Sequence, residues 1–72
     1  MIASIFNITG ADDEVAYLVS FHAGHMDFEV VCYNSAAVLV LVAKFGIVAV
    51  DYDENPHSVV IAALKSVGVR IR

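Results

Sequence analysis

The amino-acid sequence predicts a small α/β protein: a single domain over residues 1–72, with a mostly parallel four-stranded sheet in the order β-α-β-α-β-α-β. Three observations favour this fold. Gly24, Gly46 and Gly68 recur at a constant interval of 22 residues. Each follows an apolar segment, as does the residue just beyond the C-terminus of many helices. Runs of β-branched and aromatic residues separate these segments, and such alternation is typical of a parallel sheet with right-handed crossovers.

The expected strands are short and apolar. They cover Ile2–Ile8, Phe28–Tyr33, Ile47–Tyr52 and Val69–Ile71. We expect the last of these to lie at the edge of the sheet, where its backbone N–H and C=O groups could pair with another strand. Its side chains should alternate, with Val69 and Ile71 on one face and Arg70 and Arg72 on the other.

The expected helices carry recognisable start signals. Asp12, Asp13 and Glu14 precede a first helix over Val15–His22, where carboxylates favour the positive end of the helix dipole. Asn34 or Ser35 can cap a second helix over Ser35–Phe45. Asn55 followed by Pro56 opens a third helix. The three glycines that follow these helices should adopt positive φ angles.

An alternative fold remains open for the first of these helices. Val15, Leu18, Val19 and His22 share one face of a helix, but Tyr17, Val19 and Phe21 also alternate with more polar neighbours, as in a strand. In that case residues 23–26 form a hairpin loop. The protein would then be an α+β domain with an N-terminal β-hairpin.

Composition and charge exclude several classes of protein. Only 4 residues are Lys or Arg and the net charge is −4, so we expect no nucleic-acid partner. The most apolar stretch, Ala36–Val50, contains Lys44 and is too short for a membrane-spanning helix, which needs about 20 residues. The single cysteine, Cys32, excludes an internal disulfide and suits a reducing compartment. With no signal peptide at the N-terminus, we expect a cytoplasmic protein.

The apolar content predicts association with another protein. The sequence is 60% apolar and 17% charged, against about 45–50% and about 25% in typical soluble domains. A chain this short cannot bury so many apolar side chains, and the surplus should form an exposed patch. The second helix is apolar on all sides, so its outer residues Leu39, Val40 and Ala43 should form a homodimer interface, together with Val69 and Ile71 of the edge strand.

Acidic residues follow two of the expected parallel strands. Ligands of a parallel sheet sit beyond the carboxyl ends of its strands. Asp12, Asp13 and Glu14 follow the first strand, and Asp51, Asp53 and Glu54 follow the third. Such a rim could hold Mg²⁺ or dock a basic partner. Equally, these carboxylates could do no more than stabilise helix N-termini and keep the protein soluble.

Part of this pattern resembles a known family. Asp12-Asp13-Glu14 after the first strand, Asp51 at the end of the third strand with Pro56 soon after, and the closing segment 64–71 are similar to the first half of a response-regulator receiver domain. The resemblance implies that Asp12 and Asp13 bind Mg²⁺ and that Asp51 accepts a phosphoryl group. In this chain Thr9-Gly10-Ala11 separates the acid pair from the strand.

The remaining chemistry-bearing residues form no recognisable catalytic set. His22, His25, Cys32 and His57 are zinc-ligand types, but Cys32 lies about 20 Å from His25 if the intervening segment is extended. We therefore expect no enzyme and no cofactor. The sequence predicts a non-catalytic interaction module, a small acidic self-associating regulator or inhibitor such as phages and plasmids encode. The alternative is a truncated receiver-like phosphoacceptor or Mg²⁺-binding switch.

Overall fold

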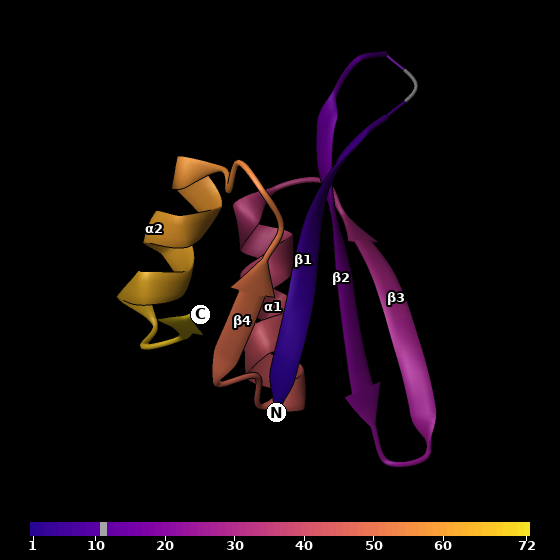
Figure 1. Cartoon of the computed structure of the whole chain (residues 1–72), viewed down its shortest axis with the longest axis vertical. Helices are drawn as coiled ribbons and strands as arrows, with labels where there is room; N and C mark the ends of the chain where they lie inside the picture. Colours follow the sequence, from indigo (N-terminus) through magenta and orange to yellow (C-terminus); the bar gives the residue numbers. More distant parts are fainter. Residues whose placement is uncertain (11) are drawn as a thin grey trace.

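The computed structural model describes residues 1–10 and 12–72, and this part of the chain forms a five-stranded mixed sheet with two helices (Figure 1). The elements in chain order are β1 (Ile2–Thr9), β2 (Val15–Ala23), β3 (Met26–Cys32), α1 (Ser35–Phe45), β4 (Ala49–Tyr52), α2 (Ser58–Ser66) and β5 (Arg70–Ile71).

The sheet is antiparallel on one side and parallel on the other. Its strand order is β3-β2-β1-β4-β5, with β1 in the centre. The first three strands form an antiparallel meander, whereas β4 and β5 run parallel to β1. The prediction of a mostly parallel four-stranded sheet is therefore wrong, although β5 does lie at the edge. The alternative with an N-terminal β-hairpin is confirmed.

The segment that was expected to be the first helix is instead the strand β2. Tyr17, Val19 and Phe21 all point into the core, while Val15 and His22 are exposed. β-Branched and aromatic residues at alternate positions suit a pleated surface with one buried face. This alternation buries three large side chains, and it prevails over the helical spacing of Val15, Leu18 and His22.

The glycines have the expected backbone angles. Gly24, Gly46 and Gly68 have φ values of 63°, 69° and 82°. Gly46 follows α1 in the left-handed conformation, and its N–H bonds to the Val42 carbonyl. Gly24, however, opens a two-residue turn between β2 and β3, since Ala23 pairs with Met26. A glycine at this position fits the type II′ hairpin turn.

The two helices begin at different kinds of residue. The Asn34 side chain accepts a hydrogen bond of 2.8 Å from the Ala37 backbone N–H, so the predicted cap of α1 is confirmed. The helix α2 begins at Ser58, two residues beyond the expected Pro56, because Asn55 has a φ of 60° and the chain turns there. Within the described residues, neither helix is long and apolar enough to cross a membrane.

Both helices cover the same face of the sheet. Val38 of α1 and Val60 and Leu64 of α2 are fully buried in one core. The sheet contributes Ala3, Ile5, Val19 and Val50 to this core. At one end an aromatic group closes it: the rings of Phe21, Phe28 and Phe45 have centroids 4.7–5.7 Å apart. In Figure 1, α1 lies behind the sheet, and the opposite face points toward the reader.

Candidate functional site

The face of the sheet opposite the helices, which we name the open face, carries a row of large apolar side chains. Side chains alternate along each strand, so residues that flank the buried ones point outward. Phe6 pairs with Leu18, and Leu18 pairs with Val31, in one row across β1, β2 and β3. Phe6 is 38% exposed and Val31 is 43% exposed. Among residues 1–10 and 12–72, no helix covers this row.

Further apolar residues extend the row in both directions. Ile2 and Ile8 lie on the same face of β1 as Phe6. Ala16 and Ala49 also face this side, and both are buried, yet neither belongs to the core beneath the helices. Larger neighbours on the open face therefore cover them. On β1, Ser4 lies between Ile2 and Phe6 and pairs with Ser20 of β2, so two small polar side chains interrupt the apolar surface.

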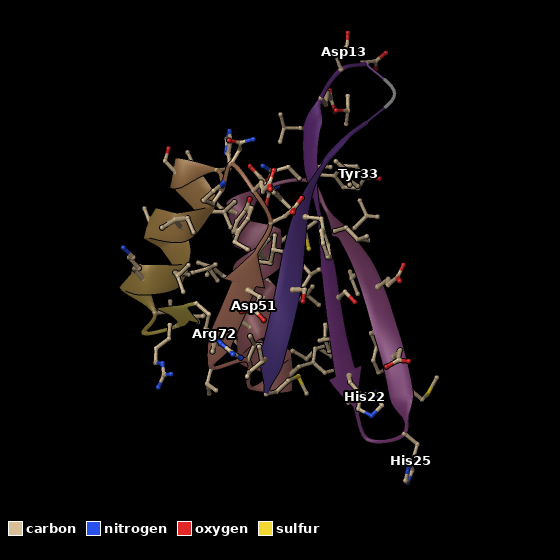
Figure 2. All side chains as sticks on the ribbon, viewed as in Figure 1. Asp13, His22, His25, Tyr33, Asp51 and Arg72 are labelled. Carbon is tan, nitrogen blue, oxygen red and sulfur yellow. The ribbon has the colours of Figure 1, made fainter. Side chains whose placement is uncertain are left out.

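Charged residues of opposite sign flank this surface. On one side Asp27 and Glu29 project from β3, and on the other side Arg70 and Arg72 project from β5. The Asp27 carboxylate lies 2.6 Å from His22 Nδ1. Arg72 Nε lies 3.5 Å from the Asp51 carboxylate (Figure 2). The open face is thus acidic at the β3 edge and predominantly basic at the β5 edge, with apolar and small polar side chains between them.

A second group of polar residues gathers at the carboxyl ends of β1 and β4. The Tyr52 hydroxyl donates a hydrogen bond of 2.6 Å to Asn7 Oδ1. Asn7 Nδ2 donates a bond of 2.8 Å to the Asn55 carbonyl. Nearby, the Tyr17 hydroxyl lies 2.8 Å from His57 Nδ1. We call these five residues the polar cluster.

The polar cluster holds the loop between β4 and α2 against the sheet. Burial raises the pKa of the Tyr52 phenol, and the nearby His57 backbone N–H partly opposes this rise. The Asn7 amide uses both its oxygen and its nitrogen on protein partners. The residues described here enclose no pocket. These contacts hold the loop between β4 and α2 in place, so the polar cluster stabilises the fold.

The structure does not bring the predicted Mg²⁺ ligands together. Asp12 and Asp13 lie in the loop between β1 and β2, and Figure 2 shows Asp13 beyond the end of the sheet. Asp51 lies within β4, level with Ser4, and pairs with Arg72. Ser4 is five residues from the end of β1, which corresponds to about 17 Å along the strand. Among the described residues, no group of three or more His, Cys, Asp or Glu side chains could hold a metal ion.

The predicted interface residues divide between the core and the surface. Val40 of α1 is 64% exposed and Ala43 is exposed too, whereas Leu39 packs partly against the core. Val69 is buried, and Ile71 is half-buried against the same core. As expected, Arg70 and Arg72 point to the other side of the sheet. Only Val40 and Ala43 of this set present a free apolar surface in the part of the chain described.

The nominal zinc ligands serve other purposes or lie apart. Cys32 is buried beside Tyr17, its neighbour across β2 and β3, and burial raises the pKa of its thiol. His22 bonds to Asp27 on the open face. His25, labelled in Figure 2, lies in the turn after β2, whereas His57 contacts Tyr17 near the start of that strand.

Sequence reasoning missed the open face as a unit. The signal was present in β1, where Ile2, Phe6 and Ile8 occupy alternate positions that share one face. The sequence analysis interpreted β2 as a helix, so it did not identify the β2 side chains that share this face. Nothing in the sequence pairs Asn7 with Tyr52, so the polar cluster could not be predicted.

Comparisons of the chain with protein-family models, with curated proteins and with solved structures give no match.

Proposed function

We propose that this protein is a non-catalytic protein–protein interaction module: a small, acidic, self-associating regulator or inhibitor that acts by occupying a site on another protein. The observation that carries the proposal is the open face, where Phe6, Leu18 and Val31 form an exposed apolar row on a sheet whose two edges carry opposite charges. Exposed apolar side chains beside charged residues are typical of a protein-binding site.

The exposed apolar side chains of the open face supply the free energy for binding a partner. Fully burying a side chain such as Phe, Leu, Ile or Val is worth about 1.5–3 kcal/mol relative to leaving it exposed. Ile2, Phe6 and Val31 are each at least one-third exposed, so a partner that covers them gains a good part of this free energy. Their rigid backbone, held in the sheet, reduces the entropy lost on binding.

A receiver-like phosphoacceptor or Mg²⁺ switch has less support. Receiver-type sheets are doubly wound and parallel, whereas β2 runs antiparallel to both of its neighbours here. Asp51 also faces an arginine rather than Asp12 and Asp13. This alternative would be revived by Mg²⁺-dependent shifts in the resonances of all three carboxylates.

The proposal is tested by comparing three baits in affinity capture from source cells: the wild-type protein, Phe6→Glu on the open face, and Val59→Glu on α2. Both variants place a charge at an exposed apolar position. We expect the wild type and Val59→Glu to retain the same partner and Phe6→Glu to lose it. A partner that binds all three baits equally would show that the open face is not the binding site.

A further inference from the structure

We propose that the open face binds a second copy of this chain, face to face, in a dimer whose two-fold axis runs along the strands between the two sheets. This inference rests on the proposed function, because it names the partner of the same surface. It differs from the sequence-based expectation, which placed the dimer interface on the outer side of α1 and on Val69 and Ile71 of the edge strand.

Two rows of residues cross all five strands, and the members of each row lie at one height along the strands. In the first row, Asp27 pairs with His22 on β2, and Ile2 pairs with Ala49, which pairs with Arg70. Since Ala3 pairs with Phe21, His22 lies next to Ile2 and joins the two halves of this row. An acid at the β3 edge thus lies level with an arginine at the β5 edge.

The second row repeats this arrangement two residues farther along. Glu29 pairs with Ser20, Ser20 with Ser4, and Ser4 with Asp51. Arg72 follows Ile71, the partner of Val50, and therefore lies level with Asp51, to which it bonds. Each row begins with an acid on β3 and ends with an arginine at the β5 edge, Arg70 in the strand or Arg72 just after it.

A two-fold axis along the strands matches these charges. Such a rotation keeps the height of each row and exchanges the two edges of the sheet. Asp27 then faces Arg70 of the second copy, and Glu29 faces Arg72 of the second copy. A two-fold axis across the strands would instead place β3 on β3, acid against acid. The distribution of charge on the open face is self-complementary for the first axis and repulsive for the second.

The apolar row of Phe6, Leu18 and Val31 is also compatible with a two-fold axis along the strands. The rotation places the central strand β1 on itself, so Phe6 of one copy packs against Phe6 of the other. Leu18 and Val31 lie level with Phe6, so they flank this pair and face the segments just beyond the carboxyl ends of β4 and β5 in the second copy. Two aligned sheets pack about 10 Å apart, with their strands at about −30°.

The size of the open face sets the expected affinity. Five strands about 4.8 Å apart and a height of six residues at about 3.3 Å give roughly 480 Å² per copy. The pair would bury roughly 1,000 Å², at the lower limit for a specific complex. We therefore expect a reversible dimer that dissociates upon dilution through the micromolar range.

Paired charge reversals test this arrangement. One variant carries Asp27→Lys with Glu29→Lys, and the other carries Arg70→Glu with Arg72→Glu. Each variant alone should be monomeric in sedimentation velocity, because its dimer would bring like charges together at all four edge contacts. An equal mixture should form a heterodimer, in which every contact again joins opposite charges. The two edges lie about 19 Å apart within one chain, so internal pairing cannot produce this rescue.

A second pair of variants changes no charge, so it tests the interface even if the charge-reversal variants misfold. Phe6→Thr removes the side chain at the axis and should weaken dimerisation at least about tenfold, or about 1.4 kcal/mol. The matched control, Val40→Thr on α1, should leave the dimer unchanged. Circular dichroism on every variant confirms that the fold is retained.

Three outcomes would overturn the inference. If the mixture stays monomeric although both variants are folded, the edges do not meet. If Val40→Thr weakens the dimer and Phe6→Thr does not, α1 is the interface, and the self-association in the proposed function survives. If the wild type is monomeric at millimolar concentration, there is no dimer. A different protein captured through the open face would still support an interaction module.

Discussion

The Tyr17 hydroxyl and His57 Nδ1 lie 2.8 Å apart, although the two residues are 40 positions apart in the sequence. Tyr17 lies in β2 and its side chain is almost fully buried, whereas His57 immediately precedes α2. Their rings also approach within 5.8 Å of each other, centroid to centroid. This contact ties the antiparallel half of the sheet to the start of the second helix.

Tyr17→Phe should therefore destabilise the protein. The substitution keeps the ring and removes the hydroxyl, which leaves the His57 nitrogen without this partner. We expect the free energy of unfolding to fall by about 1 kcal/mol, the usual net worth of such a hydrogen bond. Urea denaturation measures the change. The matched control is Tyr33→Phe, whose ring is 70% exposed and which should have no effect. Equal stability of the two variants would show that the contact contributes nothing.

The Tyr52 phenol should make stability depend on pH in alkaline solution. Burial raises its pKa in the folded protein above the ordinary value of 10.0. The unfolded chain therefore loses the proton first as the pH rises. The contribution to stability is complete below pH 10 and declines as the pH rises through the folded pKa. Denaturation of wild type and Tyr52→Phe at successive pH values checks this, and parallel curves for the two proteins would contradict it.

Cys32 should react slowly with thiol reagents while the protein is folded. Its side chain is 2% exposed, and burial raises the pKa of the thiol, so the reactive thiolate is scarce at neutral pH. We expect modification by iodoacetamide to accelerate sharply in denaturant. The rate in urea should follow the unfolding transition recorded by circular dichroism. Rapid labelling of the native protein at neutral pH would show that the strand region around Cys32 opens locally.

Gly46→Ala should cost about 1 kcal/mol of stability, because alanine pays a steric penalty at positive φ that glycine does not. Gly46 has a φ of 69°, and a Cβ atom there would meet no neighbour within 4 Å, so the cost comes from the backbone alone. Gly10→Ala is the control, since Gly10 is outside the left-handed region and its Cβ would make only ordinary contacts of 3.5 Å or more. Thermal denaturation that ranks the two variants equally would contradict the prediction.

The second half of the fold could be predicted from the sequence because its signals are local. Asn34 and Gly46 delimit α1 at both ends, and the apolar run before Asp51 marks β4. In the first half, the same signals were ambiguous. A glycine with positive φ serves a hairpin turn as well as a helix terminus, so the regular spacing of Gly24, Gly46 and Gly68 could not distinguish the two.

The candidate site could be predicted only in part, because it depends on strand pairing. The surplus of apolar residues indicated an exposed surface but not its position. Locating it requires the register that aligns Phe6 with Leu18 and Leu18 with Val31, and no local signal sets that register. Likewise, Asp27 and Arg70 reach equal heights on opposite edges through contacts between strands far apart in sequence. The outer face of α1 could be identified from the sequence because the spacing of residues along one helix determines which of them share a face.

The central position of β1 has a consequence for how the protein forms on the ribosome. Residues 2–32 contain β1, β2 and β3, which pair by short hairpins and can assemble as soon as they emerge. The other edge of β1 stays vacant until residues 49–52 have been synthesised and have crossed over to it. During that interval an apolar strand edge is open to pairing with other nascent chains. Rapid placement of β4 after α1 has formed therefore shortens the interval in which this edge of β1 is exposed.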